Sequence, residues 1–255
     1  PRLPFGHRAS GSTPPRAHML LCLVCRSRLP PQAPSVGTRR ALLSAASRVT
    51  PSDVLHFWFG PDFSTRKSDP EPERVKMWFT RDEEVDSSAC EFIPQIRAAG
   101  RSELGLQWES REGKMAQLVL LDQLSRNAFR GQAEAYEYDE RAREVALELI
   151  EEARGTPGTL PTPAALFVIT CLMHSEVMEH HMIAAEFAHA QYDATQSKMI
   201  QRQLENDLPE HTKVLTRFGR YPHRNKLYGR RTTPEEEAWL QSDECPGWAK
   251  SQAVG

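Results

Sequence analysis

The chain has 255 residues, enough for one domain of ordinary size with additional segments, and its formal net charge is −2. Residues 1–52 contain eight Arg, no Lys and no acidic residue, which leaves 24 of the 32 basic residues against all 34 acidic ones, a net charge of −10 for the rest. Such an acidic body argues against broad binding to nucleic acid or to an anionic membrane surface. The five cysteines are too sparse for a disulfide scaffold and favour a reducing compartment.

The first 52 residues are expected to form a disordered leader. They are rich in Arg, Ser, Ala and Pro, a composition typical of transit segments to the mitochondrion or plastid; a cytoplasmic location is the alternative. The apolar run Met19–Cys25 is too short to span a bilayer, and no other stretch is a candidate. Cys22 and Cys25 have redox or zinc spacing, but no second pair follows them, so neither a cofactor nor a metal is predicted.

After the leader, the first predicted helices are short. Asp53–Gly60 forms a helix with Gly60 as its stop, and Glu73–Phe79 forms a second. The pattern Thr80-x-x-Glu83 is a capping box that opens a third helix, which runs to about Ala99. Pro94 is expected to kink this helix or to start a new segment.

The stretch Gly113–Gly131 contains the central helix. It begins apolar on every side, which predicts burial, and ends with Asp122, Arg126 and Arg130 four residues apart on one face. Burying charge is costly, so these groups must be satisfied by one another or by a ligand. Asp139 is expected to cap the following helix, Arg141–Arg154.

The second half of the chain also predicts only helices. Thr162-Pro163 opens a wholly apolar core helix through Met173, and Ser175 caps Glu176–Tyr192, whose buried side is expected to carry Met178, Met182, Ala185 and Ala188. Gln196–Phe218 is mostly helical with a break at Pro209, and Thr233 caps a short helix to Leu240. Residues 241–255 are expected to be a flexible tail. About nine helices and no strand predict an all-α domain over residues 53–240.

Three polar clusters border the most apolar helices, and each has a structural alternative. The first could clamp an anion, or its charges could pair with each other. In the second, a general acid or base with an orienting partner competes with a simple helix cap. In the third, a recognition loop held by Pro222 competes with a solvent-facing basic turn. The clusters are, in order, Asp122, Arg126, Asn127 and Arg130; His174 and Glu176; and His223, Arg224, Asn225 and Arg230.

The motifs around these clusters resemble the bacterial domain-of-unknown-function 924 family. They are L-x-F-W-F-G, W-F-x-x-D, L-L-D-Q-x-x-R-N-x-F-R-G, H-S-E, R-F-G-R-Y-P-H-R-N-x-x-x-G-R and T-P-E-E-E-A-W-L, and they span residues 55–240 in that order. The resemblance implies an all-helical fold of antiparallel helix pairs in a tetratricopeptide-like superhelix. It implies no activity. The polar run Asp86-Ser87-Ser88 departs from the aromatic pair that is usual in the third helix.

Two functional hypotheses follow. The first is a binding protein whose basic and amide pocket holds an anionic small molecule or an acidic peptide. The second is a hydrolase-type enzyme with His174 or His223 as base, Glu176 as its orienting partner and arginines for charge stabilisation. A third possibility is a scaffold in which the polar clusters only hold the fold together. The sequence does not indicate an oligomeric state.

Overall fold

The computed structural model describes residues 49–63 and 69–252, and every regular element within these ranges is helical. The all-α prediction is therefore confirmed, whereas the predicted leader falls almost entirely outside the described residues. No helix in the described part of the chain is long and apolar enough to cross a membrane. The α-helices are α2 (Pro51–Phe59), α3 (Pro72–Phe79), α4 (Glu83–Ala89), α5 (Ile93–Gly100), α6 (Arg111–Leu118), α7 (Ser125–Ala128), α8 (Asp139–Ala153), α9 (Thr162–Met173), α10 (Met178–Thr195), α11 (Lys198–Arg202), α12 (Leu208–Phe218), α13 (Pro234–Gln241) and α14 (Gly247–Gln252).

The central stretch is continuous but changes its winding part-way. After α6 it becomes a π-helical segment, η5 (Val119–Leu124), before returning to α-geometry in α7. Gly113 allows α6 to start tightly packed, because a Cβ there would come within 2.4 Å of the Trp108 backbone. Single π-turns inside α-helices occur frequently at functional sites, and this one contains Asp122.

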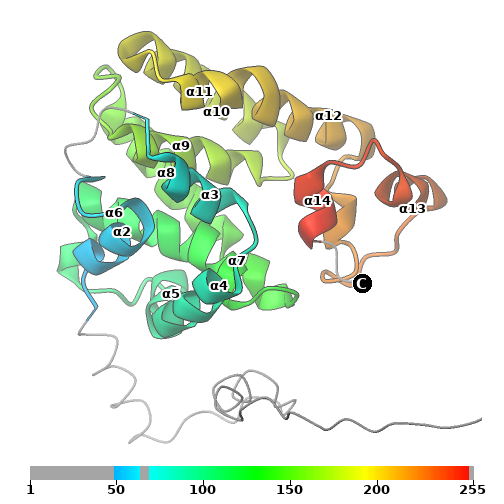
Figure 1. The fold of residues 1–255 in the computed structure, drawn as a ribbon, viewed down its shortest axis with the longest axis horizontal. Helices are drawn as coiled ribbons and strands as arrows, with labels where there is room; N and C mark the ends of the chain where they lie inside the picture. The colour runs from blue at the N-terminus through cyan, green and yellow to red at the C-terminus, as the bar shows by residue number, and fades with distance from the viewer. Residues whose placement is uncertain (1–48, 64–68, 253–255) are drawn as a thin grey trace, which may run out of the picture. The chain divides into compact units, whose positions relative to one another are not determined.

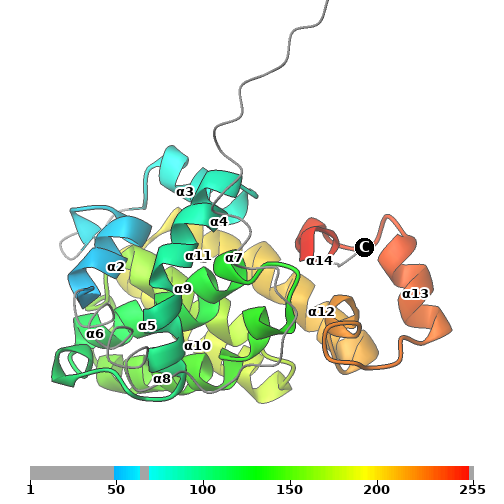
Figure 2. The same ribbon diagram turned by 90° about the horizontal axis from the view of Figure 1, so that it is seen from below.

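Consecutive helices surround this central stretch. α6 packs against α2 and α8, and α9 lies between α8 and α10 (Figure 1). α9 is buried at every residue, as its apolar sequence predicted. The main core therefore joins α2, α6, α8, α9 and α10 around the central stretch, and Figure 2 shows these helices from below.

A second, smaller core closes the C-terminal end of the domain. It joins α12 to α13 and α14, with Val214, Tyr221, Trp239, Cys245 and Ala249 buried together. This arrangement differs from the flexible tail expected for residues 241–255, since Ala249 is fully buried and residues 247–252 are helical. Apolar side chains of the tail pack against Val214 of α12 and against Tyr221 in the loop that follows it.

Several predicted helix ends differ from the structure. Asp82, not Thr80, caps α4, since its carboxylate accepts the backbone N–H groups of Glu84 and Val85. Pro209 does not interrupt its helix, because a second π-helical segment, η7 (Gln203–Asp207), precedes it and it lies in the first turn of α12. Pro94 likewise lies in the first turn of α5, as the sequence analysis allowed.

The beginning and the faces of α10 also differ from the prediction. The helix begins at Met178 rather than at Glu176, while the hydroxyl of Ser175 accepts the N–H of Val177. Met178 and Met182 were expected to be buried, but they are 37% and 68% exposed. The buried side of α10 is formed by His181, Ala184, Phe187, Ala188 and Gln191.

Candidate functional site

The charged residues of the central helix form a buried chain of alternating carboxylates and guanidinium groups. Arg126 contacts Asp122 at 3.0 Å on one side and Asp139 at 2.9 Å on the other. Arg224 continues the chain, since its Nη1 donates to Asp139 at 3.3 Å. All four side chains are less than 10% exposed. Two negative and two positive charges therefore neutralise each other inside the fold.

Asp139 owes this position to the turn before α8. The sequence suggested it as a helix cap, but Tyr138 occupies the N-cap position and Asp139 is the first residue of the helix. Its carboxylate turns inward to the two arginines instead of binding the helix N-terminus. In this position, Asp139 connects Arg126 of the central stretch with Arg224 of the loop after α12.

His174 joins the chain at the Asp122 end. Its Nδ1 lies 2.9 and 3.1 Å from the two carboxylate oxygens of Asp122. Because an ionised carboxylate only accepts, Nδ1 carries the proton and Nε2 is left as the basic nitrogen. His174 follows α9 directly as its C-cap, whereas Asp122 lies in η5, so the pair joins two core elements that are distant in sequence.

Burial and neighbouring charges set the protonation states of this pair. Burial alone would raise the pKa of Asp122, but the charge of Arg126 and the interaction with His174, which includes a hydrogen bond, outweigh it and hold that pKa below its usual value. The pKa of His174 is lowered, mainly by burial and against the opposing effect of Asp122. At neutral pH the site therefore holds an ionised aspartate beside a neutral histidine.

A small cavity of about 20 Å³ lies beside His174. Such a volume admits about one water molecule, for which roughly 10–15 Å³ is the minimum. Two of the residues that line it each have a buried polar atom without a hydrogen-bond partner in the described part of the chain, namely His223 Nδ1 and Arg224 Nε. The cavity is lined by His174, His211, Tyr221, His223, Arg224 and Trp248.

The other cavity histidines are also neutral at ordinary pH. Burial lowers the pKa of His211 to about 3, and burial followed by the charge of Arg224 lowers that of His223 well below its usual value. Two contacts fix the ring of His211. Its Nδ1 forms a hydrogen bond with the carbonyl of Asp207, and the ring stacks on Trp248 at a centroid distance of 4.0 Å. Trp248 of α14 therefore forms one wall of the cavity.

Two tyrosines hold the guanidinium of Arg224 in place. Its central carbon lies 4.8 Å from the ring centroid of Tyr136 and 4.9 Å from that of Tyr221. Tyr221 is itself fixed, because its hydroxyl donates to the carbonyl of Met173 at 2.5 Å. The Arg224 side chain is therefore held rigidly beside the cavity.

Other residues proposed from the sequence lie outside the cavity. In the first cluster, Asn127 and Arg130 both bind Asp86, which accepts one bond from the amide at 2.8 Å and two from the guanidinium at 2.6 and 2.8 Å. Asp86 belongs to the polar run that departs from the family pattern. The second half of the first cluster is thus occupied by a carboxylate of α4.

The remaining proposed residues form two further pairs. Glu176 binds Arg230 through two hydrogen bonds at 2.6 and 2.9 Å and also accepts the N–H of Tyr221 at 2.8 Å. Asn225 donates to Glu236 at 3.2 Å. Glu176 is therefore not the orienting partner of His174, a role that the structure gives to Asp122.

Three of the residues that line the cavity were not predicted from the sequence. His211 and Tyr221 were not singled out, although Tyr221 lies just before the third cluster, and Trp248 belongs to the segment expected to be flexible. A histidine on an otherwise apolar face of α12 was the available signal for His211. Among the described residues, no group of three or more His, Cys, Asp and Glu side chains is arranged to hold a metal.

Comparison with known proteins places the chain in a family. Residues 54–244 match the family model described as "Bacterial protein of unknown function (DUF924)". The chain belongs to this family. A solved structure of a protein of unknown function from Agrobacterium tumefaciens is similar, with 30% sequence identity and a TM-score of 0.57. The match covers 75% of this chain and 96% of that one, and no curated protein matches.

Proposed function

We propose that the protein is a hydrolase-type enzyme in which Asp122 orients His174 as a general base toward a water molecule in the cavity. The supporting observation is the buried Asp122–His174 hydrogen bond, which fixes the protonated nitrogen of His174 and leaves Nε2 unprotonated on a histidine that lines a cavity of about 20 Å³. An aspartate that orients and stabilises a histidine base in this way is a recurring arrangement in hydrolytic enzymes.

In the proposed reaction, His174 carries out both proton transfers and Arg224 stabilises the charge that forms. His174 Nε2 takes a proton from the water, and the water oxygen attacks a substrate carbonyl carbon. The negative charge that forms on the carbonyl oxygen lies beside the rigid guanidinium of Arg224, whose Nε is unpartnered in the described structure. His174 then returns the proton to the leaving group as the bond to that group breaks.

The charge of the site favours an acyl substrate over a phosphate ester. The positive charges of Arg126 and Arg224 are matched by Asp122 and Asp139, and the cavity histidines are neutral. A phosphate ester brings up to two negative charges and would find no surplus positive charge there. Neutral esters or amides of small acids are therefore the proposed substrates.

A larger substrate requires the site to open. Trp248 closes the cavity by stacking on His211, and α14, which carries it, contacts the loop that contains His223. Displacement of this short helix would open the cavity without moving the central stretch, because Trp248 lies near the end of the described chain whereas His174 and Arg224 are held by Asp122 and Asp139.

The test is hydrolysis of a panel of chromogenic esters and anilides of short acids between pH 6 and 9. We expect His174→Gln and Asp122→Asn each to lower the rate about 100-fold or more. His56→Gln, an exposed histidine of α2 outside the cavity, is the matched control and keeps the wild-type rate. A wild-type protein no faster than buffer, or a His174→Gln variant as fast as the wild type, would contradict the proposal.

A second candidate function, reversible binding of an anionic small molecule, is favoured by the unpartnered Arg224 Nε and His223 Nδ1. The two functions differ in their dependence on His174. If acetate or phosphate raises the melting temperature of the wild type and of His174→Gln equally, but not that of Arg224→Met, binding replaces catalysis as the explanation of the site.

A further inference from the structure

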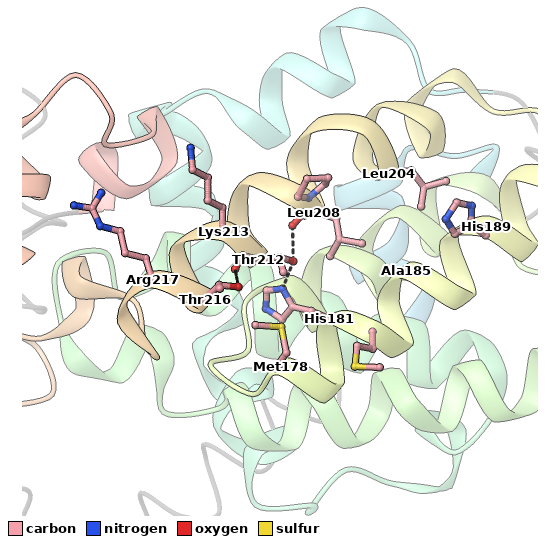
Figure 3. Close-up of a pocket in the computed structure, with 12 residues that line it drawn as sticks. Met178, His181, Ala185, His189, Leu204, Leu208, Thr212, Lys213, Thr216 and Arg217 are labelled. Atoms are coloured by element: carbon pink, nitrogen blue, oxygen red, sulfur yellow. Dashed lines mark hydrogen bonds between the residues drawn. The ribbon is translucent and has the colours of Figure 1, made fainter.

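A groove of about 680 Å³ runs between α10 and the η7–α12 segment, on a part of the molecule that the hydrolytic site does not use. On one wall, Met178, Met182, Ala185 and His189 recur at successive turns of α10. Figure 3 shows the labelled side chains of this wall facing those of Leu204 and Leu208. Met182 is 68% exposed, which is unusual for a large apolar side chain on a core helix.

Hydrogen bonds on the floor of the groove explain why its surface is apolar. The hydroxyl of Thr212 donates to the carbonyl of Leu208 at 2.8 Å and bonds His181 at 2.9 Å (Figure 3). The hydroxyl of Thr216 donates to the carbonyl of Thr212 at 2.8 Å. These polar groups are satisfied within the helices. The groove therefore offers an occupant mainly carbon and sulfur atoms.

The charged side chains that line the groove are all basic. No acidic residue lines it, and its charged members are Lys213 and Arg217, both at the end nearer the C-terminus of α12 (Figure 3). Arg217 is occupied by ion pairs with Glu235 and Glu244 at 3.1 and 3.0 Å. Lys213 is exposed and has no ion-pair partner in the described part of the chain, so this end of the groove is complementary to a carboxylate.

The dimensions favour a helix as the occupant. From Met178 to His189 the wall rises about 16 Å, or three helical turns. Apolar side chains at every third or fourth position of a docked helix would then face Met182 and Leu208. Methionine suits such a groove, because its flexible thioether adapts to different apolar side chains. A small amphiphile would leave much of this open surface exposed to water.

We propose that the groove between α10 and α12 binds an amphipathic helix of a partner protein, with an acidic residue at the end that lies against Lys213. The N-terminal segment of the chain does not meet this requirement, since residues 1–52 contain no Asp or Glu. The groove lining of a second copy would offer Lys213 no carboxylate, since it contains no acidic residue. The docked helix must therefore supply the carboxylate.

The probe is a fluorescent synthetic helix of about 18 residues with leucines along one face and glutamate at one end. A matched peptide carries lysine in place of that glutamate, and fluorescence anisotropy with the full chain reports affinity. We expect Met182→Lys to weaken the acidic peptide about tenfold, because the charge lies in the apolar contact. Leu106→Lys, at a side chain 90% exposed outside the groove, is the control and leaves affinity unchanged.

Charge reversal provides the second arm. Lys213→Glu is expected to weaken the acidic peptide about three- to fivefold and to strengthen the lysine peptide by a similar factor. Met182 and Lys213 are both exposed, so neither substitution is expected to disturb the core. Unchanged circular dichroism and melting temperature will show that the variants fold.

Equal affinity for the two peptides, no saturable binding of the acidic one, or no effect of Met182→Lys would overturn the proposal. Dimerisation that Met182→Lys abolishes, measured by light scattering, would instead assign the groove to a second copy. Binding of dodecanoate without binding of the acidic peptide would assign it to a small amphiphile. Either result would also overturn the proposal that the groove binds a helix of a partner protein.

Discussion

Replacing Arg126 with methionine would test whether the buried charge chain holds the fold together. Arg126 lies between Asp122 and Asp139, at 3.0 and 2.9 Å, and also donates from Nη1 to the carbonyl of Asp122 at 2.6 Å. Methionine keeps most of the length and apolar volume of the side chain but removes the charge. Two carboxylates that are almost fully buried would then have lost their shared cation.

The expected cost is large. Removing one partner of a buried ion pair usually costs about 3–5 kcal/mol, because the remaining charge is left uncompensated. Against a typical total of about 5–15 kcal/mol, this is a substantial fraction of the stability. With a urea m value of about 2–3 kcal/mol/M, the unfolding midpoint should fall by about 1–2.5 M.

The loss of stability in Arg126→Met should also depend on pH. In the wild type, the lowered pKa of Asp122 contributes stability that is present above its unfolded value of 3.8 and is lost as the pH falls. Without Arg126, burial dominates and raises that pKa, so stability decreases as the pH rises through the new value. The stability difference between variant and wild type should therefore be smaller at pH 5 than at pH 7.5.

Urea unfolding followed by tryptophan fluorescence at the two pH values measures both effects. Arg101→Met is the matched control, because Arg101 is more than half exposed in its pair with Glu103 and its loss should cost less than about 1 kcal/mol. An Arg126→Met variant as stable as the wild type at pH 7.5, or a stability difference that grows toward pH 5, would refute the reasoning.

Three further predictions concern the surroundings of the site. The lowered pKa of His211 makes the wild type lose stability as the pH falls below about 6.5, because the unfolded chain takes up the proton first; in His211→Phe the slope of the unfolding free energy between pH 6 and 5 should decrease by about 1 kcal/mol per pH unit. Trp248→Ala should speed carbethoxylation of the cavity histidines, measured by mass spectrometry, and an unchanged rate would show that Trp248 does not close the cavity. Asp86→Ala should cost about 1–3 kcal/mol in urea unfolding, because it leaves Asn127 and Arg130 without their carboxylate; a neutral result would mean that water replaces it fully.

Local sequence signals determined much of the helical framework. Local signals predicted the bounds of α2, α3, α9 and α13 closely, because caps and prolines act on neighbouring residues and because α9 is apolar on every side. The proline in the first turn of α9 and the capping box of α13 act within a few residues, so their effect is visible without a fold. The spacing of Asp122 and Arg126 likewise indicated their ion pair.

The partners of the polar residues depended on tertiary structure. The sequence placed His174 next to Glu176, yet packing of α9 against the central stretch gives His174 to Asp122 and leaves Glu176 to Arg230. Asp139 could serve either as a cap or as an ion-pair partner, and only the approach of Arg126 and Arg224 decides between them.

The exposed and buried faces of α10 also required the fold. Its sequence carries apolar residues on more than one side, so periodicity alone favoured Met178 and Met182 as core. The structure buries His181 and Ala184 instead, because α9 and α12 approach from that side. What the sequence determined by itself was the all-helical framework up to α13 and the residues able to carry charge into the core. Which of those residues meet was decided by tertiary packing, since each helix has several faces and only its neighbours select one.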